Sequence, residues 1–428
     1  MAGSAQKNIA LLNFPHYGHI IPFLELGKKL SRYHVVDFLV SEARIPEIHA
    51  RELLLTEPVV TGAGGSLRLV SLPDGLDLDQ CNRTGDMQIF KLRLDRITAA
   101  FETFLDAHSP DVVIADLFLH GTAKLTHSKG ITFYFFHTAS ARSALEIFAV
   151  KNDAGSDPRA TRHIAMKSAS AFSDGIIFNT AAELHPQALA LVKACPVLQG
   201  KDLKLVGPIF SADAEKESES HVQFRVWLDD QEPGSVVYVS FGSLSVPLPK
   251  QIYQVGLALL SLGKPFILSL PAEHRTHLSQ ELHAEVSASL LTGRKFLITS
   301  WAPQKLILGH SALGVFVSHC GWNSTTEAMY EGVPIVGWPL FGDQSDNAEW
   351  FCDNGIGEKV EGTGRVSETT VPAADIAGII RKVGDWDDAA RRSYRINAAK
   401  WRDVLREAVG PTGSSTRDFA DLVKFGAR

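Results

Sequence analysis

The stretch from Trp301 to Gln344 constrains the fold of this 428-residue chain more than any other. One layout occurs there three times: a short apolar run ends in a polar loop marked by Gly or Pro, and a helix-like segment follows. The apolar runs are Lys295–Ser300, Gly314–Ser318 and Val333–Gly337. Such strands, alternating with helices, form parallel sheets that bind ligands beyond the carboxyl ends of their strands. The sequence therefore predicts an α/β protein with a binding site where these loops meet.

The middle loop of this stretch predicts an anion site. Its helix is expected to end at Gly332 and to hold Trp322, Asn323 and Ser324 in its first turn. A helix N-terminus offers unpaired N–H groups and positive partial charge, both of which favour phosphate. His319, just before it, can donate to a phosphate oxygen or carry charge when an anion is bound.

The remaining polar residues of the stretch suit a base and two sugars. Glu327 lies one helical turn after Asn323 and is expected to accept from ribose hydroxyls, because a carboxylate would repel a diphosphate. Trp301 offers a flat surface on which a base can stack. Asp343 and Gln344 supply donors and acceptors for sugar hydroxyls. A base, a ribose, a diphosphate and a sugar together make a nucleotide sugar.

The ordered set resembles the donor-binding signature of the plant-type secondary-product glycosyltransferases, in the UDP-glycosyltransferase family. The elements W-x-P-Q, H-C-G-W-N-S, E, G-V-P and D-Q all stand in register. The resemblance implies the GT-B fold, with two doubly wound Rossmann-like domains facing a cleft, and a UDP-sugar donor. In the family, Trp322 and Gln344 go with glucose, whereas a His at the last position favours galactose. The donor-binding residues implied within the stretch are Trp301, Ala302, Gln304, His319, Trp322, Asn323, Ser324, Glu327, Asp343 and Gln344.

Length and composition place further bounds on the protein. A chain of this length exceeds one ordinary core, so two domains are expected. Its net charge of −6 argues against nucleic acid or an anionic membrane as partner. No apolar run reaches the length of a membrane helix, and the start is too polar for a signal peptide. Four cysteines without CxxC spacing suggest reduced thiols. We expect a cytoplasmic, monomeric protein.

The first apolar run, Ile9–Phe14, predicts a strand that leads to a candidate catalytic histidine. His19 follows it, just before the helix-like segment Ile20–Leu30, where the helix dipole favours the neutral ring that a general base requires. In the family, the catalytic histidine occupies this position. His16 is the nearby alternative. Pro22 is expected in the first turn of the helix, where its missing N–H does no harm.

Asp116 ends another apolar strand, Asp111–Leu117, and needs a partner if it is buried. On the residues alone, capping of the following helix is an equal alternative. The match to the family makes Asp116 the orienting partner of His19, which would fix the imidazole tautomer and stabilise the imidazolium.

Three further residues of the first half are expected near the substrates. The resemblance implies that Thr138 contacts the donor sugar. Phe118 and His137 are candidates for the acceptor site, although a packing role is an equal alternative for both. The polar stretch from Ala149 to Ala169 matches no family segment and is expected to include an acceptor-site loop.

The expected domain boundaries follow from these segments. An N-terminal acceptor-binding domain spans 1–210, a charged linker 211–222, a C-terminal UDP-sugar-binding domain 223–405, and a final helix 406–428 returns to the first domain. The second domain opens with the strand Ser235–Phe241, and Ser243 after it is expected to bond phosphate. Other predicted strands are Val35–Ser41, Leu67–Leu72, Thr132–Thr138 and Phe266–Leu270. The segments Gly175–Thr180 and Leu203–Phe210 are expected to close the first domain.

Competing signals are weaker. Asp77-Leu78-Asp79 resembles a metal-binding DxD, but it lies in a turn far from any donor element. The histidines show no zinc spacing. A Rossmann-type oxidoreductase is the first alternative, but Gly18 is not part of the GxGxxG motif that such an enzyme would carry after its first strand. A non-catalytic sensor of nucleotide sugars would not need the pair of His19 and Asp116.

The sequence thus predicts an inverting enzyme that needs neither a metal nor a cofactor. It would transfer glucose from UDP-glucose to a hydroxyl of a small lipophilic acceptor, such as a phenol or flavonoid. Another UDP-sugar, or a sterol or terpenoid acceptor, is the alternative within the same mechanism.

Overall fold

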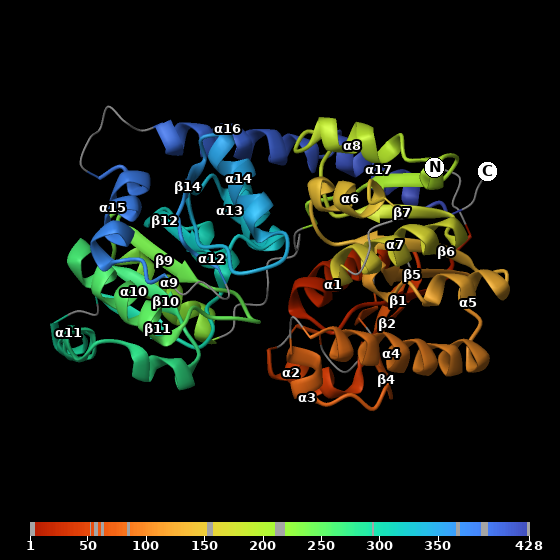
Figure 1. Ribbon diagram of the computed structural model, residues 1–428, viewed down its shortest axis with the longest axis horizontal. Helices are drawn as coiled ribbons and strands as arrows, with labels where there is room; N and C mark the ends of the chain where they lie inside the picture. The colour runs from red at the N-terminus through yellow and green to blue at the C-terminus, as the bar shows by residue number, and fades with distance from the viewer. Residues whose placement is uncertain are drawn as a thin grey trace. The chain divides into compact units, whose positions relative to one another are not determined.

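The computed structural model describes residues 5–51, 53–54, 59–60, 64–83, 86–151, 157–209, 219–292, 295–364, 369–386 and 393–425. The chain divides into two compact units: unit 1 comprises Met1–Phe210 and Glu407–Arg428, and unit 2 comprises Ser211–Arg406. Each unit has a largely parallel sheet flanked by helices, which makes it a Rossmann-like domain (Figure 1). Residues 211–218 of the expected linker lie outside the described residues. Residues 219–222 are not linker, because they begin helix α9 (Glu219–Asp229).

The sheet of unit 1 has the strand order β3-β4-β2-β1-β5-β6-β7-β8. All neighbours pair in parallel except β3 and β4. The strands are β1 (Asn8–Leu12), β2 (Val35–Ser41), β3 (Val59–Val60), β4 (Ser66–Leu72), β5 (Val112–Asp116), β6 (Thr132–His137), β7 (Gly175–Phe178) and β8 (Asp202–Leu205).

Successive side chains of each strand point to opposite faces of this sheet, and both faces are buried. In β1, Ala10 and Leu12 belong to one apolar cluster, while Ile9 and Leu11 belong to another. Helices cover both faces. Those of unit 1 are α1 (Tyr17–Leu30), α2 (Ile45–Ala50), α3 (Leu78–Asn82), α4 (Met87–Ala107), α5 (Thr122–Ser128), α6 (Ala141–Phe148), α7 (Pro158–Ala169), α8 (Pro186–Lys193) and α17 (Ser414–Leu422).

The strand order reverses direction between β1 and β5. From β1 the chain proceeds outward to β2 and β4, then returns to place β5 on the other side of β1. The two carboxyl ends therefore lie side by side at the point where open α/β sheets bind ligands. His19 follows one of these strands and Asp116 ends the other.

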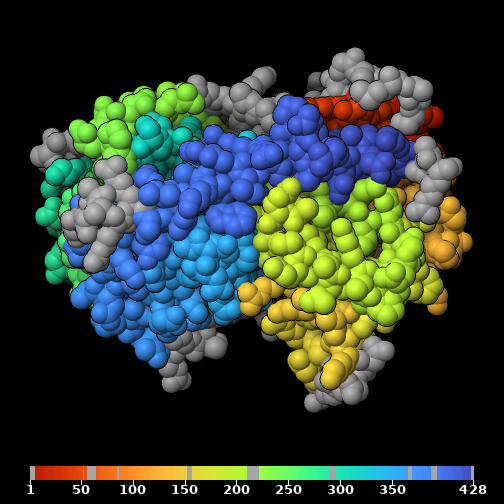
Figure 2. All heavy atoms as spheres, turned by 90° about the horizontal axis from the view of Figure 1, so that it is seen from above, coloured from red at the N-terminus to blue at the C-terminus, as the bar shows by residue number. Residues whose placement is uncertain are grey.

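Helix α17 belongs to unit 1 although the whole of unit 2 precedes it in the chain. Its Leu422 and the following Val423 and Phe425 join the apolar cluster that contains Ile9 and Leu11. The backbone N–H of Leu205, in β8, donates to the Asp418 carboxylate. In Figure 2 the dark-blue C-terminal segment lies against yellow-green residues of unit 1. This is the return to the first domain that the sequence led us to expect.

Unit 2 has an all-parallel sheet of order β11-β10-β9-β12-β13-β14. Its reversal point lies between β9 and β12, which end near Ser243 and His319. The strands are β9 (Val236–Ser240), β10 (Phe266–Ser269), β11 (Phe296–Thr299), β12 (Leu313–Ser318), β13 (Ile335–Gly337) and β14 (Gly357–Lys359). The helices besides α9 are α10 (Pro249–Leu262), α11 (Gln280–Thr292), α12 (Gln304–Leu308), α13 (Trp322–Glu331), α14 (Gln344–Asp353), α15 (Ala373–Gly384) and α16 (Ser393–Ala408).

Within the part of the chain that the structure covers, we find no helix with both the length and the apolarity that a membrane crossing requires.

Candidate active site

His19 and Asp116 form a direct contact at the reversal point of unit 1. His19 Nδ1 lies 2.7 Å from Asp116 Oδ2, and the two side chains are 17% and 2% exposed. The other carboxylate oxygen accepts from the backbone N–H of Phe118 at 2.8 Å. Asp116 therefore fulfils both roles considered for it, since it caps the following turn and pairs with His19. Because Nδ1–H donates to the carboxylate, a neutral His19 ring has Nε2 as its free base.

The helix that carries His19 starts earlier than the sequence indicated. Helix α1 begins at Tyr17, with His16 as its N-cap residue, so His19 lies inside the first turn. Pro22 lies beyond that turn, within the helix. The expected place of Pro22 was therefore wrong, because the polar residues before Ile20 already adopt helical geometry.

Thr138, expected to contact the donor sugar, follows β6 and lies next to the same pair. Its Oγ1 is 3.2 Å from His19 Nδ1, and the residue is 7% exposed. Two side chains from the ends of β5 and β6, those of Asp116 and Thr138, thus converge on the Nδ1 atom of His19.

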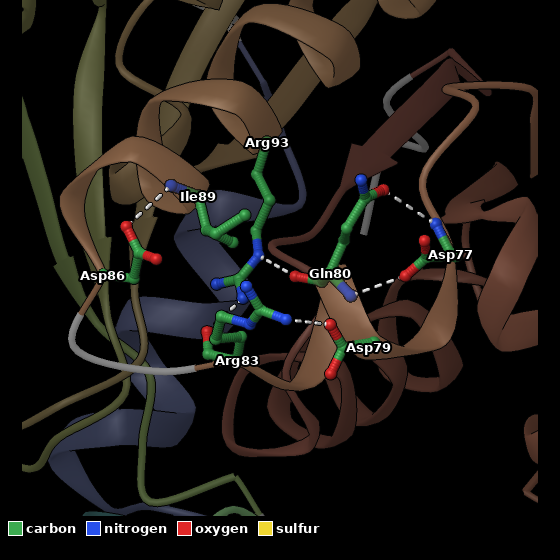
Figure 3. Close-up of polar contacts among 7 residues, drawn as sticks. All are labelled: Asp77, Asp79, Gln80, Arg83, Asp86, Ile89 and Arg93. Atoms are coloured by element: carbon green, nitrogen blue, oxygen red, sulfur yellow. Dashed lines mark hydrogen bonds and ion pairs between the residues drawn. The ribbon is translucent and has the colours of Figure 1, made fainter.

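His16, the alternative base, is engaged elsewhere. It is 8% exposed, and its Nε2 accepts from Arg93 Nη1 at 3.0 Å. Burial, together with nearby His19 and Arg93, holds its pKa well below the usual value. Arg93 also donates to the backbone carbonyls of Gln80 and Arg83, which ties α4 to α3 (Figure 3). His16 therefore positions the loop after β1 and does not present a free nitrogen.

The DxD-like residues also have structural partners. Asp77 is the N-cap of α3 and forms a capping box with Gln80, and Asp79 pairs with Arg83 (Figure 3). Asp86 caps α4 through the backbone N–H of Ile89. These contacts fix the first turn of α4, which carries Phe90.

The two acceptor candidates differ in their surroundings. Phe118 is partly buried, and its ring centroid lies 4.8 Å from that of His19. His137 is 4% exposed, and its Nε2 donates to the Ser140 carbonyl at 3.1 Å. Burial lowers the pKa of His137 to about 4. The packing alternative is therefore the one that the structure supports for His137, because its ring is enclosed.

In unit 2, His319 stands before the N-terminus of α13, between two glycines. A Cβ on either Gly242 or Gly321 would lie 2.6 Å from His319 Nε2, so both positions must lack a side chain. Gly242 also has φ +80°, which favours glycine. His319 Nδ1 is buried without a hydrogen-bond partner, and burial lowers the pKa of this ring to about 4. An unsatisfied ring nitrogen beside a helix N-terminus fits the expected phosphate ligand.

Helix α13 begins at Trp322 and ends at Gly332 in the left-handed conformation, as the sequence predicted. Gln304 ties its exposed face to α12. The Gln304 side-chain amide donates to Ser324 Oγ at 3.0 Å and to Glu327 Oε2 at 2.7 Å. Three predicted donor-binding residues are therefore in mutual contact. Asn323 precedes Glu327 by one helical turn and is partly exposed.

Trp301 and Trp322, two of the three tryptophans of the stretch, have different environments. Trp301 is 45% exposed and stacks on His221, with centroids 6.2 Å apart. Trp322 is 4% exposed and Ala302 is 5% exposed. Little of the Trp322 side chain is therefore accessible to a ligand. Ser243 is exposed after β9.

Asp343 and Gln344 begin α14. The Gln344 side-chain carbonyl accepts from the backbone N–H groups of Leu340 and Phe341 at 2.8 and 3.0 Å. Its amide group is thereby directed away from this loop and is available as a donor. Asp343 Oδ2 accepts from Asn347 Nδ2 at 3.0 Å, and the same nitrogen donates to the Cys320 carbonyl. Asn347 thus joins the starts of α13 and α14, a role that the sequence analysis missed.

Sequence reasoning also missed Phe90 and Arg162, which lie next to Phe118. The centroids of Phe90 and Phe118 are 5.9 Å apart, and the Arg162 guanidinium carbon lies over both rings. Arg162 is on α7, within the stretch expected to be an acceptor-site loop. Residues 152–156 of that stretch lie outside the described residues, but 158–169 are helical. Asp157 as N-cap and Pro158 at the first position were the available helix-start signals.

The chain is similar in sequence to known glycosyltransferases. The family model for UDP-glucoronosyl and UDP-glucosyl transferase matches residues 176–383. Anthocyanidin 3-O-glucosyltransferase 2 of Manihot esculenta is 31% identical over 58% of this chain and 72% of its own. Mogroside I-E synthase of Siraitia grosvenorii is 25% identical over 99% of this chain and 98% of its own.

Solved structures show the same fold. Os79 from O. sativa in complex with UDP has a TM-score of 0.79 at 22% identity, over 97% of this chain and 99% of its own. Phytolacca americana UGT2, complexed with UDP-2fluoro-glucose and pterostilbene, has a TM-score of 0.78 at 23% identity, over 98% of both chains. The fold is GT-B, and the chain belongs to the plant-type UDP-glycosyltransferase family. It is an enzyme whose donor is a UDP-sugar.

Proposed function

We propose that this enzyme transfers glucose from UDP-glucose to a hydroxyl group of a small lipophilic acceptor, such as a phenol or a flavonoid. The observation that carries the proposal is the 2.7 Å contact between His19 Nδ1 and Asp116 Oδ2 at the reversal point of unit 1. It provides a base with a defined free nitrogen. A relative named for anthocyanidins and a structural neighbour complexed with pterostilbene support an acceptor of this kind.

In the proposed reaction, His19 Nε2 removes the proton of the acceptor hydroxyl as its oxygen attacks the anomeric carbon. Asp116 stabilises the imidazolium that forms. The bond between the anomeric carbon and the β-phosphate oxygen breaks, and UDP leaves with the electron pair. Because the oxygen attacks opposite to UDP, one displacement inverts the centre and converts an α-linked donor into a β-glucoside. Thr138, next to His19, remains the candidate contact of the donor sugar from unit 1.

The developing charge on UDP needs stabilisation. We assign it to the backbone N–H groups at the start of α13, together with His319 and the Ser243 hydroxyl. This is the basis for proposing that no metal is required. Trp301 is proposed to stack on the base, Glu327 to accept from the ribose, and Asp343 and Gln344 to bind the sugar hydroxyls. Gln304 and Ser324 support Glu327 through their mutual contacts.

A mass-spectrometric screen tests the proposal. Purified protein is incubated with UDP-glucose and a panel of phenolic, flavonoid and terpenoid acceptors, with EDTA present. The expected result is a product heavier by one hexose despite the chelator. Turnover only with another UDP-sugar would overturn the choice of glucose. Turnover only without EDTA would overturn metal independence. Binding of UDP without transfer from any donor would favour the sensor alternative.

A further inference from the structure

Arg162 is a charged side chain beside the proposed acceptor site for which the described residues provide no hydrogen-bond or ion-pair partner. Its guanidinium carbon lies 5.2 Å from the ring centroid of Phe90 and 5.6 Å from that of Phe118. Its Nε is buried without a hydrogen-bond partner, and across the described residues the side chain makes no ion pair. A guanidinium that is half removed from water normally pairs with a carboxylate or a phosphate, because its fork of donors otherwise loses hydration without compensation.

The neighbouring carboxylates are already used. Asp157 caps α7 through the backbone N–H groups of Arg159 and Ala160. Glu146 forms an ion pair with the Arg159 side chain. The carboxylates closest to Arg162 along α7 and α6 are thus engaged with other groups, and the charge of Arg162 is left for a ligand.

The histidines near Arg162 in the described part of the chain add no charge at neutral pH. Burial and the adjacent Arg162 lower the pKa of His120. Burial, Arg162 and Arg159 lower the pKa of His163 to about 4. Both imidazoles are therefore neutral near pH 7, and neither competes with a ligand for the Arg162 guanidinium.

Phe118 links Arg162 to the proposed base. The Phe118 ring centroid is 4.8 Å from the His19 ring centroid and 5.6 Å from the Arg162 guanidinium carbon. The distance from the His19 ring centroid to the guanidinium carbon therefore cannot exceed the sum of these two distances. Phe14 lies on the same aromatic surface, 5.6 Å from His19 and 5.4 Å from Phe118 between ring centroids. A planar acceptor about one aromatic ring and a short side chain long can reach both groups.

We propose that Arg162 selects acceptors that carry a carboxylate, or a similarly acidic group, at the end opposite to the hydroxyl that is glycosylated. This inference rests on the proposed function and names its substrate class. The guanidinium binds the carboxylate through two parallel hydrogen bonds, while the aromatic surface holds the ring and His19 faces the hydroxyl. Because the carboxylate is held at Arg162, the hydroxyl is the group that attacks, and the product is a glycoside and not an acyl ester.

The proposal is tested with two acceptors that differ only in charge. Para-hydroxyphenylpropanoate and its primary amide have the same shape, but only the first is an anion at pH 7. With saturating UDP-glucose, we expect kcat/KM of the wild type to be at least about tenfold higher for the acid, the size of a charge-assisted hydrogen bond. The product should be stable to mild alkali, as a phenolic glycoside is and an acyl ester is not.

Variants separate the charge of Arg162 from its packing. Arg162→Met keeps an apolar stem over Phe90 and Phe118, and should lower the acid-to-amide ratio of kcat/KM at least about tenfold. Arg162→Lys should retain part of the ratio, since it keeps the charge but loses the fork. Lys167→Met, on the same helix, is the matched control and should leave the ratio unchanged, because Lys167 donates to the Val150 carbonyl and its loss frees no carboxylate.

The outcomes are distinguishable from failure of the proposed function. A higher kcat/KM of the wild type for the amide would overturn the role of Arg162. An acid-to-amide ratio of kcat/KM in Arg162→Met equal to that of the wild type would do the same. In both cases the glucosyl transfer itself would stand. An alkali-labile product from the acid would show that the carboxylate attacks, and would also overturn it. Absence of transfer from every UDP-sugar to both acceptors would overturn the proposed function and this inference with it.

Discussion

His19 and Asp116 are far apart in sequence, but they lie close to the carboxyl ends of the adjacent strands β1 and β5. The carboxylate divides its two oxygens between the His19 ring and the backbone N–H of Phe118. This arrangement fixes the direction of the carboxylate and, through it, the tautomer of the ring. Asp116 is therefore a positioning residue: it determines which nitrogen of the His19 ring carries the proton.

Asp116→Asn should therefore lower kcat by about 10²-fold or more, because the amide can donate to Nδ1 and leave the proton on Nε2. Steady-state kinetics with UDP-glucose and the best acceptor would measure the change. UDP affinity, measured by calorimetry, should stay within about threefold of the wild type, since the residues that we propose to bind UDP belong to unit 2. A kcat within tenfold of the wild-type value would contradict the orienting role.

His137 should make the protein less stable in acid. Its pKa is about 4 in the folded chain, because the ring is buried, against an ordinary value near 6.5. The unfolded chain therefore takes up a proton first as the pH falls, and this contribution to stability is lost between about pH 6.5 and pH 4. From pH 7 to pH 5 we expect a loss of about 2 kcal/mol from this residue.

His137→Phe retains a buried ring that does not titrate, so its free energy of unfolding should fall less between pH 7 and pH 5 than that of the wild type. Urea unfolding at the two pH values measures this difference. Equal losses in both proteins would show that His137 is protonated in the folded state as readily as in the unfolded one.

At the scale of elements, most strands were predictable because each is a short apolar run bounded by turn residues. β2 spans the predicted Val35–Ser41, and α10 spans Pro249–Leu262, where Pro and Gly mark its ends. Helix α7 was missed because its polar composition hides the cap at Asp157.

The candidate site was predictable to the extent that its residues follow strand ends. His19, Asp116, Thr138, Ser243 and His319 all do so, and topology then brings neighbouring ends together. Arg162, Phe90 and Asn347 lie on helices, where their positions depend on packing between elements distant in sequence. No local sequence pattern predicts such contacts.

The close packing of Gly242 and Gly321 against the His319 ring gives a prediction about the loop after β9. Gly242→Ala places a Cβ 2.6 Å from His319 Nε2 at a residue with φ +80°, so either the loop or the ring must move. We expect UDP affinity to fall at least about tenfold, as for the loss of one hydrogen bond to a charged group. Gly263→Ala also has positive φ but open space around it, and serves as the control for backbone strain. An equal effect of both substitutions would argue against a role of the His319 position.

At the scale of the whole molecule, the chain leaves unit 1, forms unit 2 and returns to complete unit 1 with α17. The return makes the first core depend on the last residues of the chain. Leu422 is 1% exposed and packs in the cluster that contains Phe23 and Phe136.

Leu422→Ala should lower the free energy of unfolding by about 2–5 kcal/mol, the usual cost of removing a large buried side chain. Chemical unfolding followed by circular dichroism would measure it. Leu191→Ala is the matched control, because Leu191 is 58% exposed and should change stability by less than about 0.5 kcal/mol. Similar effects of the two substitutions would show that α17 does not stabilise the core of unit 1.

The central claim is that His19 is the base of a glucosyl transfer in which UDP is bound by other residues. The most direct measurement compares His19→Ala with the wild type in two assays, initial rates with UDP-glucose and UDP binding by calorimetry. The account predicts a loss of at least about 10²-fold in rate with UDP affinity unchanged within about threefold. A variant that turns over at the wild-type rate, or one that loses UDP binding and activity together, would contradict it.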